Sequence, residues 1–202
     1  MNLVSILGVL RLVINKMEEK KYLKVAKKFF KIGEQHYKIG NYEKSISAFK
    51  KAFEYFECAS SIAKKKYKEI PIGKEYLANV YYNLGKYKES FEAYIKAGQI
   101  YYEMKEYNKA IELFKSAIKT NYNLFKIYYN LGLVYLAIGK YEEAEHNFKE
   151  ALKENPKFAE AHYGLGLVYH RLGHDDLLFD QLKTLKKINK KLANKLFEKV
   201  YK

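Results

Sequence analysis

The sequence predicts an all-α fold built from stacked antiparallel helix pairs, and three observations support this prediction. Apolar residues recur at spacings of three and four along most of the chain, which places them on one face of a helix. The same pattern returns every 34 residues over 91–124, 125–158 and 159–192. The chain has only two prolines, and glycines such as Gly139 stand where one helix should end and the next begin.

The segment 125–158 shows the pattern most clearly. Large apolar residues stand at its positions 4, 7, 11 and 24 and small ones at positions 8, 20 and 27: Tyr128, Leu131, Tyr135, Phe148, Gly132, Ala144 and Ala151. Gly139 suits the left-handed residue that ends a first helix, and Pro156 ends the second helix. One such hairpin cannot bury its apolar face alone, so it must stack on neighbours.

This pattern resembles the tetratricopeptide repeat (TPR) family, with Tyr128 in place of the usual Trp at position 4. The resemblance covers roughly residues 26–192, strongly from residue 91 and more weakly before it. It implies a right-handed superhelical solenoid that serves as a protein–protein interaction scaffold rather than as an enzyme.

We expect one solenoid domain over residues 1–202, with regular repeats preceded by weaker ones. Its predicted parts are an apolar N-terminal segment (1–15), a weak repeat (26–59), an irregular repeat (60–90), the regular repeats 91–124, 125–158 and 159–192, and a C-terminal capping helix (191–201). The capping helix follows from apolar residues that share one face near the C-terminus, since terminal repeats often cap the stack.

The stretch 42–70 departs from the repeat pattern. Its apolar residues continue at spacings of three and four, and neither Gly nor Pro interrupts them before Pro71. This favours one long helix, about twice the length of its neighbours. The alternative is a break near Ser60–Ser61, which would give five repeats in one frame over 26–192.

The apolar segment 1–15 contains Arg11 and is shorter than the roughly 20 residues that a membrane-spanning helix needs. It also lacks the basic region and the small-residue cleavage site of a secretory signal. Three interpretations remain open: a cap on the first repeat, which we favour, a self-association seam, or a peripheral membrane anchor.

The net charge of +15 is carried almost entirely by lysine, since Arg11 and Arg171 are the only arginines. Such a charge favours anionic partners, so binding of nucleic acid or an anionic membrane through the lysine-rich ends is the alternative function. Specific phosphate recognition prefers arginine, and a solvated lysine-rich surface explains most of the charge. The single cysteine, Cys58, cannot form an internal disulfide, which favours a reducing compartment and a cytoplasmic location.

No pattern of catalytic, cofactor-binding or metal-binding residues stands out in the sequence. His170 and His174 are four residues apart and precede Asp175 and Asp176, which could outline a metal site. Gly173 and the expected turn separate the two histidines, so they need not share a helix face. We therefore expect no metal and no cofactor.

In the TPR family, positions 2, 5, 9 and 12 of the first helices line a concave groove. The resemblance therefore implies a partner-binding groove that includes Ile95, Gln99, Tyr102, Lys126, Tyr129, Leu133, Leu136, Tyr163, Leu167 and His170. This set is mostly apolar and aromatic, which suits a peptide or helix of a partner protein. The alternative is that another part of this chain, such as the apolar N-terminal segment, covers these residues.

Some family members bind chaperone tails through a carboxylate clamp. Asn130 occupies one clamp position, but the preceding repeat offers Ile95 and Gln99 and the following one offers Glu160 and Gly164. These residues depart from the Lys, Asn and Arg that the clamp requires. We therefore expect a partner other than a chaperone tail.

Overall fold

The structure, a computed structural model, describes residues 3–64 and 67–201, without the side chains of residues 3–7 and 9. The described residues are helical and form no strand, which confirms the predicted all-α class. In these residues the helices are α1 (Leu3–Lys38), α2 (Tyr42–Ala63), α3 (Glu69–Asn83), α4 (Tyr87–Glu103), α5 (Tyr107–Ile118), α6 (Leu124–Ala137), α7 (Tyr141–Glu154), α8 (Ala159–Leu172), α9 (Asp175–Ile188) and α10 (Lys190–Tyr201).

The helices form two compact units, residues 1–97 and residues 98–202. The boundary falls inside α4, so the start of α4 belongs to the first unit and its end to the second. The predicted organisation as one solenoid domain over residues 1–202 stays a prediction.

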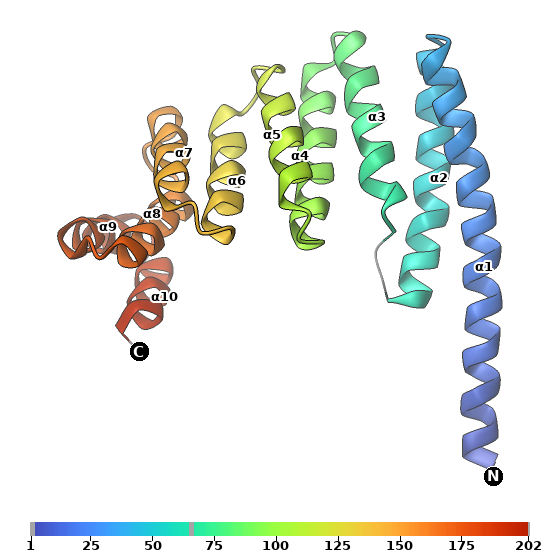
Figure 1. Cartoon of the computed structure of the whole chain (residues 1–202), viewed down its shortest axis with the longest axis horizontal. Coiled ribbons are helices and arrows are strands. Elements are labelled where there is room, and N and C mark those ends of the chain that lie inside the picture. Colours follow the sequence, from blue (N-terminus) through green and yellow to red (C-terminus); the bar gives the residue numbers. More distant parts are fainter. Residues whose placement is uncertain (1–2, 65–66, 202) are drawn as a thin grey trace. The chain divides into compact units, whose positions relative to one another are not determined.

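In the first unit, α1 and α2 form an antiparallel pair (Figure 1). Their turn contains Gly40, whose φ of 73° is left-handed, and the Asn41 side chain caps α2 by accepting a 3.4 Å hydrogen bond from the Lys44 N–H. Phe49 and Phe56 of α2 are fully buried in the core of this unit. With 36 residues against 22, α1 extends well past the end of α2.

The predicted long helix over 42–70 is wrong, because α2 ends at Ala63. Lys64 adopts a left-handed backbone with φ 51°, which stops the helix without glycine or proline. The next helix, α3, holds Pro71 in its first turn, where a missing N–H breaks no helical hydrogen bond. The end of α2 also lies beyond the alternative break near Ser60–Ser61.

Tyr67 explains why the apolar pattern runs on past the helix end. It lies between α2 and α3, yet it is buried against the core of the first unit. Its hydroxyl donates a 2.6 Å hydrogen bond to Glu19 of α1. Tyr67 continues the apolar spacing because it packs into the core, although it lies outside a helix. Residue spacing alone cannot distinguish this arrangement from a continuous helix.

Serine replaces alanine at a close contact in both hairpins of the first unit. The Ser45 hydroxyl donates a 3.0 Å hydrogen bond to the Gly33 carbonyl, and the Ser90 hydroxyl donates a 2.8 Å bond to the Ala78 carbonyl. Both serines are fully buried. The short side chain lets two helices approach closely while its hydroxyl stays hydrogen-bonded.

In the second unit, α6 packs on α7 and α8 packs on α9, as the predicted fold class of stacked helix pairs requires. Gly139 and Gly173 follow α6 and α8 with left-handed φ values of 77° and 73°. The Phe148 ring of α7 is fully buried against Gly132 of α6 and Gly164 of α8. Small residues therefore permit close helix packing here, as the pattern predicts.

The predicted capping helix is confirmed as α10, which packs on α8 and α9. Leu196 is fully buried on this helix, in direct contact with Gly166 of α8. On another face of α10, the Phe197 and Tyr201 rings pack against each other at 4.9 Å and remain half exposed.

Candidate functional site

Nine of the ten predicted groove residues lie in the second unit, on the end of α4, on α6 and on α8, whereas Ile95 belongs to the first unit. Gln99, Lys126 and His170 are exposed. The half-buried apolar members on α6 and α8 pack against the core of the second unit: Tyr129, Leu133, Leu136, Tyr163 and Leu167.

Tyr129 is at the centre of an aromatic group. Its ring lies 5.0 Å from the Phe158 ring at 71° and 5.9 Å from the Phe148 ring. Burial raises the pKa of the Tyr129 hydroxyl above its ordinary value, and Glu160, Tyr102 and Tyr163 raise this pKa further. Tyr102 of α4 and Tyr163 of α8 therefore both lie within electrostatic range of Tyr129 on α6.

Polar side chains join α4 to α6 beside this aromatic group. The Gln99 amide donates a 3.4 Å hydrogen bond to the Asn130 side-chain oxygen. The Asn130 amide in turn donates a 2.7 Å bond to the Lys126 carbonyl one turn earlier. Since Asn130 is buried and bonded within the chain, it serves the packing of α6 in this structure.

The capping helix contributes a residue that the groove prediction missed. The Lys195 ammonium lies over the Tyr163 ring, 5.5 Å from its centroid, a distance typical of a cation–π contact. A signal for this contact exists in the sequence, because Leu196 stands at position 4 when the 34-residue register continues past residue 192. In that register α10 takes the place of a further first helix and brings Lys195 to Tyr163.

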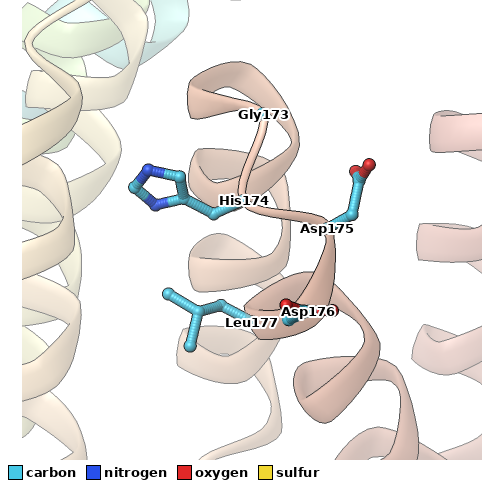
Figure 2. Close-up of a pocket in the computed structure, with 5 residues that line it drawn as sticks. All are labelled: Gly173, His174, Asp175, Asp176 and Leu177. Atoms are coloured by element: carbon cyan, nitrogen blue, oxygen red, sulfur yellow. The ribbon is translucent and has the colours of Figure 1, made fainter.

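The turn between α8 and α9 forms an open pocket of about 500 Å³. Three residues of the possible metal site, His174, Asp175 and Asp176, line this pocket. It is lined by Gly173, His174, Asp175, Asp176 and Leu177 (Figure 2). Figure 2 shows the His174 and Asp175 side chains pointing in different directions. Among the described residues, no group of three or more His, Cys, Asp or Glu side chains is arranged to hold a metal ion.

A second pocket, of about 210 Å³, lies between α9 and α10. Its lining combines apolar rings with lysine stems: Phe179, Leu182, Lys183, Lys186, Phe197 and Tyr201. The lysine-rich C-terminal end therefore has an apolar hollow, and its binding of an anionic partner stays a prediction.

In the described part of the chain, no helix combines the length and the apolar character needed to cross a bilayer. The single cysteine, Cys58, is exposed with a free thiol.

Residues 98–139 and 134–173 match the family model described as "TPR repeat". Together with the helix pairs of the second unit, this match identifies residues 98–173 as tetratricopeptide repeats. Repeats of this kind generally serve protein interactions, which supports a protein partner in general.

Several solved structures are similar to the chain, each at low identity. The second TPR domain of human RPAP3, solved with an HSP70 peptide, is 24% identical with a TM-score of 0.49 and covers 53% of this chain and 91% of its own. YrrB, a TPR protein with an unusual peptide-binding site, is 18% identical with a TM-score of 0.49, covering 84% and 90%. A MamA protein is 22% identical with a TM-score of 0.44, covering 87% and 93%. No curated protein matches the chain.

Proposed function

We propose that the chain is an interaction scaffold that holds a peptide or helix of a partner protein along the face of α6 and α8, bordered by the end of α4. The observation that carries this proposal is the group of Tyr102, Tyr129 and Tyr163, one tyrosine from each of these helices, in which Tyr102 and Tyr163 lie near enough to raise the pKa of the Tyr129 hydroxyl. A ligand that follows the three helices in turn would contact one tyrosine at each step.

The chemistry of these side chains suits protein recognition. Tyrosine offers a large apolar ring with few rotatable bonds and a hydroxyl for hydrogen bonding, which is why it is frequent among the residues that dominate binding energy. Leu133 and Leu167 are half buried beside the tyrosines and add apolar surface. The exposed Lys126 and His170 provide polar groups at the border of the face.

The test uses peptides selected from a displayed random library against the full chain. The affinity of a selected peptide is then measured by fluorescence anisotropy for the wild type and for a variant with Tyr129→Ser, Leu133→Ser and Tyr163→Ser. We expect this variant to lose affinity by roughly 100-fold or more, since central aromatic residues contribute about 2 kcal/mol or more each. Circular dichroism should show unchanged helical content.

A matched control removes two tyrosines and one leucine from exposed positions elsewhere, with Tyr87→Ser, Leu177→Ser and Tyr201→Ser. This control should bind the selected peptide as the wild type does. The proposal fails if the first variant also binds normally, or if the library yields no peptide that binds the chain. Binding that appears only after residues 1–15 are removed would instead support a cover within the chain.

A further inference from the structure

The N-terminal part of α1 carries a second apolar surface that the packing of the first unit does not use. Five of its apolar side chains are between 48% and 67% exposed: Leu10, Leu12, Val13, Ile14 and Met17. The N-terminal part of α1 extends past the end of α2, since α1 has 36 residues and α2 has 22 (Figure 1). The favoured prediction, a cap packed on the first repeat, does not fit these exposed side chains.

Most of this surface points away from the core of the first unit. An α-helix turns by about 100° per residue, so Met17 and the fully buried Ala26, nine residues apart, lie on opposite sides of α1. Leu10 and Ile14 precede Met17 by seven and three residues and share its side. The exposed apolar stripe is therefore not an extension of the seam that packs on α2.

The same side of α1 changes from apolar to basic after Met17. The alternating spacing of four and three continues through lysines that are all exposed: Lys21, Lys24, Lys28 and Lys31. We call the line from Leu10 to Lys31 the outer stripe of α1. Its first half is apolar and its second half is positively charged.

We propose that the outer stripe of α1 binds the surface of an anionic lipid bilayer, independently of the peptide-binding face proposed above. The apolar half would enter the boundary between headgroups and acyl chains, while the lysines lie over anionic headgroups. A helix lying in the surface plane presents both halves to the membrane at once. The net charge of +15 adds long-range attraction to the same surface.

A second copy of the chain fits the outer stripe less well. In a parallel pair, the lysine half of one helix would face the lysine half of the other, and like charges at an interface are destabilising. Leu12, which is 57% exposed, lies two residues from Leu10 and therefore about 200° around the helix. A single helix–helix seam would leave Leu12 exposed, whereas the lipid boundary can surround more of the helix circumference.

The test measures cosedimentation of the full chain with vesicles of phosphatidylcholine alone and of phosphatidylcholine mixed with phosphatidylserine. We expect binding to the mixed vesicles at least tenfold stronger than to the neutral ones, and weaker binding as salt is added. Ile14→Glu with Met17→Glu should lower binding to the mixed vesicles by at least tenfold, because it places two charges in the apolar half. Leu177→Glu with Phe179→Glu, at exposed positions of α9, is the control and should bind as the wild type does.

The charged half is tested with Lys21→Gln, Lys24→Gln and Lys28→Gln. Each lysine near an anionic surface contributes roughly fivefold in affinity, so the triple variant should bind on the order of 100-fold more weakly. Lys186→Gln, Lys187→Gln and Lys191→Gln remove the same charge from exposed positions of α9 and α10 and should have a clearly smaller effect.

Three outcomes would overturn the proposal. Equal binding to neutral and mixed vesicles, or no binding to either, would show that an anionic bilayer is not the ligand. Equal losses from the two lysine triples would show that net charge, rather than the outer stripe, governs binding. A dimer in light scattering that Ile14→Glu with Met17→Glu converts to a monomer, without vesicle binding by the wild type, would assign the stripe to a second copy.

Discussion

Gly132 of α6 directly faces the Phe148 ring of α7, so that a Cβ atom on Gly132 would lie 2.6 Å from the ring carbon Cε1. The ring cannot easily move away, because a Cβ atom on Gly164 of α8 would also lie 2.6 Å from it on Cζ. The fully buried Phe148 thus fills the space that two glycines leave between three helices.

Replacing Gly132 with alanine should therefore destabilise the second unit. Overpacking of a tight core costs typically 1–3 kcal/mol, and the better helix propensity of alanine offsets about 1 kcal/mol of this cost. We expect a net loss of up to about 2 kcal/mol in the free energy of unfolding, measured by urea denaturation. Adding Phe148→Leu to Gly132→Ala should show favourable coupling in a double-mutant cycle, since the smaller side chain leaves room for the new methyl group.

Gly8→Ala in α1 is the matched control, because a Cβ atom there has no atom within 4 Å. It should leave the free energy of unfolding unchanged or raise it slightly. Equal effects of the two alanine substitutions, or additive effects in the cycle, would contradict the steric explanation.

The capping helix should contribute strongly to stability through one side chain. Leu196 is fully buried against α8, so Leu196→Ala removes apolar contacts and leaves a cavity. We expect a loss of about 2–5 kcal/mol in the free energy of unfolding. Phe197→Ala on the same helix removes a larger ring that is 49% exposed and should cost clearly less. A larger effect at Phe197 than at Leu196 would show that α10 packs differently in solution.

The helix pairs of 91–192 could be predicted from the sequence because glycines stand at turns between helices. Gly139 and Gly173 occupy two such turns in the structure. The prediction of one long helix over 42–70 is wrong because lysine, not glycine, takes the left-handed position that ends α2. Lys64 has φ 51° there, and local pattern gives no warning of such a residue. Tyr67 is held against the core by contacts such as its hydrogen bond to Glu19, which lies 48 residues earlier in the sequence.

In the candidate site, too, the residues that follow the repeat pattern could be predicted from the sequence, and those outside it could not. Tyr129 and Tyr163 occupy the same position in consecutive repeats, so the register places both on one face. Lys195 reaches Tyr163 from the capping helix, whose path the predicted repeats did not include. Ile95 shares the register of the groove residues, but it lies in the other compact unit.

Lys105 takes the position between α4 and α5 that Gly139 takes between α6 and α7, and its φ of 62° is left-handed. A left-handed backbone costs a residue with a Cβ atom about 1–2 kcal/mol relative to glycine. Glycine also loses more entropy on folding, which offsets part of the gain. We expect Lys105→Gly to raise the free energy of unfolding by up to about 1 kcal/mol in urea denaturation.

The reciprocal change, Gly139→Lys, should lower the free energy of unfolding by about 1 kcal/mol, because φ there is 77° and the surroundings are open. If both substitutions shifted stability in the same direction, backbone conformation would not be the controlling factor at these turns.

Tyr94 should make stability depend on alkaline pH. Its side chain is buried, and its hydroxyl donates a 2.5 Å hydrogen bond to the Asn79 side-chain oxygen. Burial, followed by nearby Glu75, raises the pKa of Tyr94 to about 12, against about 10 in an unfolded chain. Because the folded pKa is the higher one, the unfolded state loses its proton first, and the stabilisation present below pH 10 is lost as pH rises towards 12.

Tyr94→Phe isolates this contribution from the other tyrosines. At about pH 8 the variant should be less stable than the wild type by about 1 kcal/mol, because it lacks the hydrogen bond to Asn79. Since phenylalanine cannot ionise, the difference in the free energy of unfolding should shrink as pH rises from 10 to 12. Urea denaturation of both proteins across this range measures the difference. A difference that stays constant up to pH 12 would mean that Tyr94 ionises equally readily in the folded and unfolded chains.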